Sequence, residues 1–179
     1  MFPLYRCFVL SISVLIGPFA FADDFNRATR PAKTSGELAG SSAPARSKPL
    51  SPSARERIVA RAHELVGHRY KWGGTSVETG FDCSGLLFYL YRSVANLHLP
   101  RTTQAMLARR EATVSHNELQ PGDAVFFSHN GSRRSRHVGL YIGDGRFIHA
   151  PSTGKTIRIN SLKEQYWKKN YLTARSFRG

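Results

Sequence analysis

The sequence has little cysteine and few acidic residues. Two cysteines in 179 residues exclude a small domain held together mainly by disulfide bonds. Twelve Asp and Glu stand against 26 Lys and Arg, a formal net charge of +14, so the expected partners are acidic: nucleic acid, anionic lipid or an acidic wall polymer. Long apolar runs are also lacking, because the longest lies at the N-terminus and is too short to span a bilayer comfortably. Hydrophobic residues still make up 41%, enough for one folded domain with a buried core.

Residues 1–22 have the pattern of a secretory signal peptide. A positively charged start precedes an apolar stretch from Cys7 to Ile16, and Ala20 and Ala22 form the small-x-small site that precedes cleavage. The alternative is an uncleaved membrane anchor, and Cys7 lies inside the apolar run, where it is badly placed for lipidation. With cleavage after Ala22 we expect a mature protein that has no stable membrane anchor and whose single cysteine is Cys83.

Composition divides the rest of the chain at residue 52. Residues 23–52 are rich in small, basic and proline residues, which predicts a flexible linker, and residues 53–179 have the patterns of one folded domain. A capping box from Ser53 to Glu56 predicts a helix that ends at Gly67, and a second helix is expected at 83–94 and a short third one before Arg110. Strands are expected at 124–127, 137–142, 146–150, 156–159 and 171–177. Helices followed by antiparallel strands predict an α+β fold.

Cys83 is a candidate nucleophile. It lies in the first turn of the expected second helix, with Asp82 at the N-cap. The positive end of the helix dipole then favours the thiolate over the thiol. The alternative, a buried structural cysteine, is equally compatible with this position.

Two histidines are placed to serve such a nucleophile. With residues 143–145 as a three-residue turn, strands 137–142 and 146–150 pair so that His137 and His149 are diagonal neighbours on one face. Gly139 then removes a side chain that would crowd the imidazoles. A base and an orienting partner are what a cysteine nucleophile needs. A zinc site of Cys83, His137 and His149 is the alternative, but no metal-ligand spacing supports it, so no metal is expected.

Six short motifs occur in the order of a known family. They are Tyr70-x-Trp72-Gly73-Gly74, Phe81-Asp82-Cys83-Ser84-Gly85, Leu99-Pro100-Arg101-Thr102, Leu119-x-Pro121-Gly122-Asp123, His137-Val138-Gly139-x-Tyr141-Ile142-Gly143 and Phe147-Ile148-His149-Ala150. Together they resemble the NlpC-type (NlpC and p-sixty) cysteine peptidases of bacterial cell walls. The ending around Tyr166-Trp167 is most similar to the compact murein endopeptidases of the MepS type.

The resemblance implies a papain-like α+β fold and hydrolysis of peptidoglycan stem peptides without a cofactor. It implies Cys83 as nucleophile, His137 as base and His149 as the third polar residue. Tyr70 is implied as an oxyanion or substrate-binding residue, and Asp82 and Ser84 as substrate-binding residues. A more basic loop than the family pattern, with Arg133, Arg134 and Arg136, receives no role.

The expected reaction is cleavage of the cross-bridge between D-Ala and diaminopimelate. The alternatives are cleavage between D-Glu and diaminopimelate within one stem, which uses a free amine on the substrate, and a catalytically silent peptidoglycan-binding protein. Nucleic acid is not an expected partner, because the basic residues are dispersed and the signal peptide directs the protein out of the cytoplasm. A cysteine acyltransferase is disfavoured because the permuted relatives with that activity place His before Cys, whereas here Cys83 comes before His137. We expect a monomer in the periplasm.

Overall fold

The computed structural model describes residues 48–109, 112–128 and 137–178. The expected signal peptide, the expected linker up to residue 47 and the basic loop with Arg133, Arg134 and Arg136 lie outside the described residues. No helix in the described part of the chain is long and apolar enough to cross a membrane.

Four α-helices, one 3-10 helix and eight strands make up the described residues. In chain order they are α1 (Pro52–Glu64), β1 (Thr75–Ser76), β2 (Gly80–Phe81), α2 (Cys83–Ala95), α3 (Thr103–Ala108), β3 (Ala112–Val114), η1 (His116–Glu118), β4 (Ala124–Phe127), β5 (His137–Gly143), β6 (Arg146–His149), β7 (Arg158–Ser161), α4 (Gln165–Asn170) and β8 (Tyr171–Ser176). Six strands form one antiparallel sheet in the order β3-β8-β4-β5-β6-β7, and β1 pairs with β2. The predicted α+β class is confirmed.

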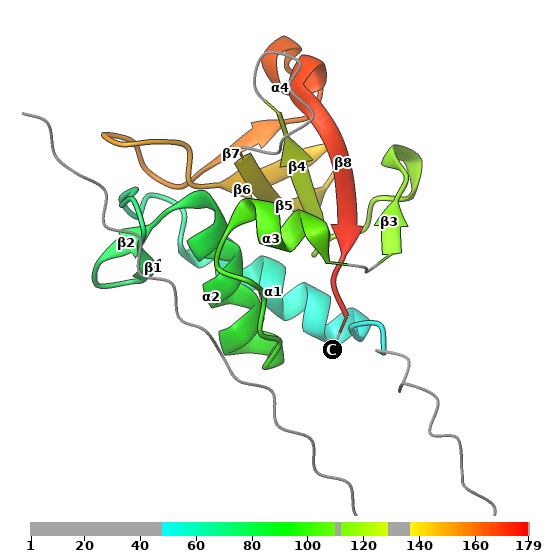
Figure 1. Ribbon diagram of the computed structural model, residues 1–179, viewed down its shortest axis with the longest axis horizontal. Coiled ribbons are helices and arrows are strands. Elements are labelled where there is room, and N and C mark those ends of the chain that lie inside the picture. The colour runs from blue at the N-terminus through cyan, green and yellow to red at the C-terminus, as the bar shows by residue number, and fades with distance from the viewer. Residues whose placement is uncertain (1–47, 110–111, 129–136, 179) are drawn as a thin grey trace, which may run out of the picture. The chain divides into compact units, whose positions relative to one another are not determined.

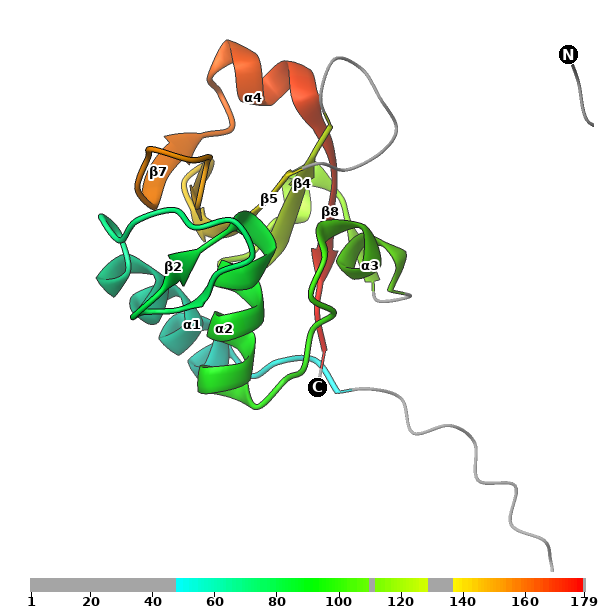
Figure 2. The ribbon, with the colours of Figure 1, turned by 60° about the vertical axis from the view of Figure 1, so that its left-hand side comes forward.

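The large sheet separates two apolar clusters. Successive side chains of a strand point to opposite faces, and all four residues of β4 are buried. Phe126 belongs to the cluster between the sheet and helices α1 and α2. Val125 and Phe127 belong to the second cluster, which includes Trp167 of α4. Figures 1 and 2 show α1 and α2 side by side beneath the sheet and α4 at its other end.

The start of α1 corrects the predicted capping box. Ser51 is the N-cap, with its hydroxyl accepting a hydrogen bond from the Ala54 N–H at 3.2 Å, and Pro52 is the first helical residue. Proline is favoured there because its fixed φ suits the helix and its missing N–H has no intrahelical partner to lose. Arg55 then pairs with the buried Asp123 at 2.7 Å and holds α1 to the sheet.

The second and third helices and most strands lie where the sequence places them. β7 begins two residues later than predicted, and five elements were missed: β1, β2, β3, η1 and α4. Each of these has six residues or fewer, so the sequence offers too few periods to identify it.

The β5–β6 turn differs from the predicted one. Gly143 pairs with Arg146, so the loop is Asp144-Gly145, with φ of 55° and 70°. Two positive φ values are typical of the type I′ turn that joins twisted strands. A register shift between Tyr141 and Gly143 takes up the extra residue. Leu140 still pairs with Ile148, as the three-residue turn predicted, so the expected faces of the two strands are retained beyond the bulge.

Candidate active site

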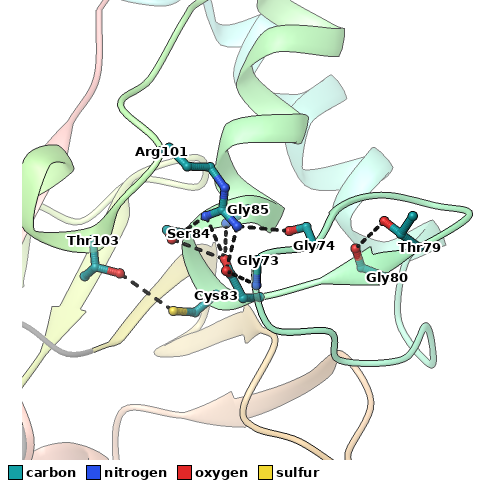
Figure 3. A network of polar contacts seen from close by, with 10 residues as sticks. Gly73, Gly74, Thr79, Gly80, Cys83, Ser84, Gly85, Arg101 and Thr103 are labelled. Carbon is teal, nitrogen blue, oxygen red and sulfur yellow. Dashed lines mark hydrogen bonds and ion pairs between the residues drawn. The ribbon is translucent and has the colours of Figure 1, made fainter.

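The N-terminus of α2 carries Cys83, as predicted. Asp82 is the N-cap, and its carboxylate accepts a hydrogen bond from the Gly85 N–H at 2.7 Å. A Cβ on Gly85 would lie 1.9 Å from the Gly74 carbonyl oxygen, so only glycine allows this close approach. The half-buried Cys83 sulfur points toward the Thr103 hydroxyl, 3.7 Å away (Figure 3).

The resting state of Cys83 differs from the expectation of a stabilised thiolate. Burial raises the pKa of the thiol above its usual value, and the charge of Asp82 adds to the increase. Hydrogen bonds from Thr103 and from the backbone N–H groups of Val138 and Ser84 lower the pKa without cancelling the burial. The neutral thiol is therefore favoured, and Cys83 would need a base in order to act as a nucleophile.

His137 and His149 meet as the sequence predicted. His137 begins β5, His149 ends β6, and His137 Nε2 lies 2.7 Å from His149 Nδ1. The rings are almost perpendicular, with centroids 4.9 Å apart. Val138 directly follows His137, and its backbone N–H lies close enough to the Cys83 sulfur to lower the pKa of the thiol, which brings β5 next to the candidate nucleophile. The role assigned to Gly139 needs correction, because a Cβ there would meet the Phe147 ring at 2.6 Å rather than an imidazole.

Aromatic side chains surround the two imidazoles. The Trp167 ring lies 5.5 Å from the His137 ring and 4.9 Å from the His149 ring, and Phe147 lies 5.0 Å from His149. Burial lowers the pKa of His137 to about 3 and that of His149 to about 4. The neighbouring His149 lowers the pKa of His137 further, and Arg158 makes a smaller contribution at both rings. Both rings are therefore neutral at neutral pH, as a base must be before it accepts a proton.

Two further residues extend the histidine pair. His149 Nε2 lies 2.8 Å from Asn160 Oδ1, and Asn160 Nδ2 donates to both oxygens of Glu164 at 2.9 and 3.1 Å. Sequence reasoning assigned no role to Asn160, Glu164 or Trp167. The one sequence signal was the Tyr166-Trp167 motif, which singled out Trp167 without giving it a role.

Asp82 is the centre of a polar network. Oδ1 accepts hydrogen bonds from Gly85 N–H, the Ser84 hydroxyl and Arg101 Nη1, and Oδ2 accepts from Gly73 N–H and Arg101 Nη2, at 2.6–3.2 Å. Figure 3 shows Arg101 reaching over this group. Burial favours a higher pKa for Asp82, but Arg101 and the backbone donors outweigh it, so the pKa lies below its usual value. Arg101 was quoted within a motif but received no predicted role.

A cleft of about 430 Å³ opens beside Cys83. The exposed ring of Trp72 lies at it, and Tyr70 also lines it, with a pKa raised by burial and by the neighbouring Cys83 and Asp82. The predicted residues Tyr70, Asp82, Cys83 and Ser84 are thus brought together. The complete lining is Tyr70, Trp72, Gly73, Asp82, Cys83, Ser84, Arg101, Thr102, Thr103 and Gln104.

The motifs implied a cysteine at a helix N-terminus beside a cleft, with a hydrogen-bonded histidine pair on neighbouring strands, and the structure has this arrangement. The family model described as NlpC/P60 family matches residues 67–176. The chain belongs to the NlpC/P60 family. Among the described residues, no group of three or more His, Cys, Asp or Glu side chains is arranged to hold a metal ion.

Two curated relatives come from Escherichia coli K12. The chain is 45% identical to murein DD-endopeptidase MepH over 113 residues, which is 63% of this chain and 42% of MepH. It is 40% identical over 121 residues to the protein named murein DD-endopeptidase MepS/murein LD-carboxypeptidase, covering 68% of this chain and 62% of that one. The match therefore spans less than two thirds of either relative.

The fold is that of solved NlpC/P60 domains. The crystal structure of the NlpC/p60 domain of peptidoglycan hydrolase SagA matches with a TM-score of 0.59 and 29% identity, covering 69% of this chain and 98% of that one. The implied NlpC-type, papain-like α+β fold is thus confirmed for this NlpC/P60 domain.

Proposed function

We propose that the protein is a peptidoglycan endopeptidase that hydrolyses stem-peptide bonds by a Cys-His-His mechanism. The observation that carries the proposal is the hydrogen-bonded pair His137 and His149 on β5 and β6, together with Cys83 at a helix N-terminus beside Val138, the residue after His137. The names of MepH and MepS support murein as the substrate.

The chemistry begins from neutral groups. His137 accepts the thiol proton as the Cys83 sulfur attacks the scissile carbonyl carbon, and the carbonyl π electrons move to oxygen. The Cys83 backbone N–H, at the first helical position, and the Tyr70 hydroxyl donate to this oxyanion. As the C–N bond breaks, His137 returns the proton to the leaving amine, and water then hydrolyses the thioester. His149 orients His137 and supports its charge.

The site favours the cross-bridge between D-Ala and diaminopimelate. Cleavage between D-Glu and diaminopimelate next to a free L-Ala would need a carboxylate to hold the ammonium group. Asp82 is the one acid among the residues that line the cleft, and it is paired with Arg101. A carboxylate has about four lone-pair sites, and the donors already on Asp82 occupy them. An added ammonium group would have to displace one of those donors, whereas a stem still attached to glycan brings no such charge.

Digestion of purified sacculi tests both parts of the proposal. Mass spectrometry should detect conversion of cross-linked dimers into monomers with intact tetrapeptides. Release of free L-Ala-D-Glu with cross-bridges left uncut would instead establish the alternative bond. Cys83→Ala is the matched control and should cleave nothing. If both the wild-type protein and this variant bind sacculi and neither cleaves them, the protein is a catalytically silent binding protein.

The place of action follows from the substrate. We propose that the protein is exported by the segment 1–22, cleaved after Ala22 and active at the periplasmic face of the wall as a monomer without a membrane anchor. Mass spectrometry of the periplasmic fraction should find a chain that begins at Asp23. Recovery of the whole chain, with residues 1–22, in the membrane fraction would contradict this proposal.

A further inference from the structure

Arg158, Asn160 and Glu164, at the edge strand β7 and before α4, continue the hydrogen-bond chain that starts at the histidine pair. Asn160 is half-buried, whereas Arg158 and Glu164 are exposed. The Arg158 Nε group donates to Asn160 Oδ1 at 3.0 Å, and Glu164 accepts from Asn160 Nδ2 and from the Ser161 N–H. The proposed mechanism leaves this chain without a function.

The orientation of the Asn160 amide is fixed by neighbours of opposite polarity. A guanidinium can only donate hydrogen bonds, and an ionised carboxylate can only accept them. The Ser161 N–H bond holds the pKa of Glu164 below its usual value, so its carboxylate is ionised at neutral pH. Rotating the amide by 180° would set donor against donor at Arg158 and acceptor against acceptor at Glu164. Asn160 therefore presents its oxygen to His149.

The orientation of the Asn160 amide then determines which nitrogen of each imidazole carries the hydrogen. Since Asn160 Oδ1 accepts, His149 Nε2 must carry the hydrogen. His149 is neutral, so its Nδ1 is an acceptor, and His137 Nε2 must donate to it. His137 is neutral as well, which leaves the lone pair on its Nδ1. The reversed chain, in which Asn160 Nδ2 donates to His149, requires the disfavoured amide orientation. It would also place a hydrogen on His137 Nδ1, where that nitrogen cannot accept a proton.

We propose that Asn160 and Glu164 are positioning residues that select the tautomer of His137 able to act as a base through Nδ1. Only the last step, proton transfer from Cys83, rests on the proposed function. The tautomers themselves are a property of the folded protein and can be measured without any substrate.

Long-range 1H–15N NMR of the histidine rings tests the assignment directly, because ring nitrogens with and without hydrogen resonate far apart. In the wild-type protein at pH 7 we expect His137 and His149 to carry hydrogen on Nε2 and not on Nδ1. In Asn160→Ala, water replaces the amide and both donates and accepts, so a mixture of tautomers is expected. A wild-type His137 with hydrogen on Nδ1 would overturn the proposal.

Kinetics on a soluble dimeric muropeptide give the second readout. Asn160→Ala should lower kcat about 10- to 100-fold, taking as a guide the loss found when hydrogen-bond partners of metal-bound histidines are removed, with KM nearly unchanged. The double variant Asn160→Asp with Glu164→Gln keeps an acceptor toward His149, and it should restore the tautomer and most of kcat. Unchanged tautomers and kcat in Asn160→Ala would refute the role.

Glu118→Ala is the matched control. Glu118 accepts a hydrogen bond from Ser115, three residues earlier, much as Glu164 does from Ser161, but it lies in η1. This variant should leave the tautomers and kcat unchanged; changes equal to those of Asn160→Ala would show a general effect on the fold and overturn the proposal. If the wild-type protein has the expected tautomers but cleaves no muropeptide, the proposed peptidase activity is refuted. The tautomer assignment would still stand in that case.

Discussion

Acid should destabilise the folded protein through His137 and His149, whose pKa values are lowered, well before its carboxylates are protonated. In the unfolded chain each histidine has a pKa of about 6.5, whereas the folded values are about 3 for His137 and about 4 for His149. Between these limits the unfolded state binds more protons than the folded state, so the free energy of unfolding falls as the pH falls.

The magnitude depends mainly on the unfolded pKa. Each histidine that stays neutral in the fold costs about 1.4 kcal/mol for every pH unit below about 6.5. At pH 5 the loss is about 2 kcal/mol for each histidine and about 4 kcal/mol for the pair. This is a large part of the stability of an ordinary domain, about 5–15 kcal/mol.

Urea denaturation at pH 7.5 and pH 5.0 measures the loss. His149→Gln removes one of the two groups, so its pH-dependent loss should be about half that of the wild type. The exposed His63 on α1 supplies the control, since His63→Gln should keep the full loss. A wild-type stability that changes by less than about 1 kcal/mol between the two pH values would refute the reasoning that these rings are buried and neutral.

Three further predictions concern the nucleophile and its surroundings. Cys83 should react with iodoacetamide more slowly at pH 7 than a free thiol does, because burial raises its pKa; faster alkylation would contradict the neutral resting state. His149→Gln should retain more kcat on dimeric muropeptides than His149→Ala, and His137→Ala should retain least, since in the proposed mechanism only His137 transfers protons; equal losses would show that the roles are misassigned. Gly85→Ala should lower the thermal midpoint by several degrees, because its Cβ would overlap the Gly74 carbonyl; an unchanged midpoint would mean that this contact relaxes freely.

Local pattern was enough to predict the histidine pair. The alternation of side chains in β5 and β6 places His137 and His149 on one face whatever the exact turn, provided that the register beyond it is kept. The bulge near Gly143 absorbs the one-residue error in the predicted loop, which is why the prediction of the pair is right although the predicted turn is wrong.

The protonation state of Cys83 could not be predicted in the same way. The N-cap Asp82 and the helix start are visible in the sequence, and both were located correctly. The burial that dominates the pKa comes from segments distant in sequence, including Val138 and Thr103. Asn160 and Glu164 were missed for the same reason, because their significance depends on β7 pairing with β6.

The protonated resting thiol also bears on chemical damage. Peroxides and disulfides react with thiolates, so a cysteine whose pKa is raised by burial is oxidised slowly while the cleft is empty. In the proposed mechanism, proton transfer to His137 during attack creates the reactive form only for the lifetime of a catalytic encounter. If residues 1–22 are removed as proposed, Cys7 leaves with them and no second thiol remains in the chain to reverse an oxidation of Cys83 by forming a disulfide. Burial of Cys83 would then protect it where repair by a neighbouring cysteine is not available.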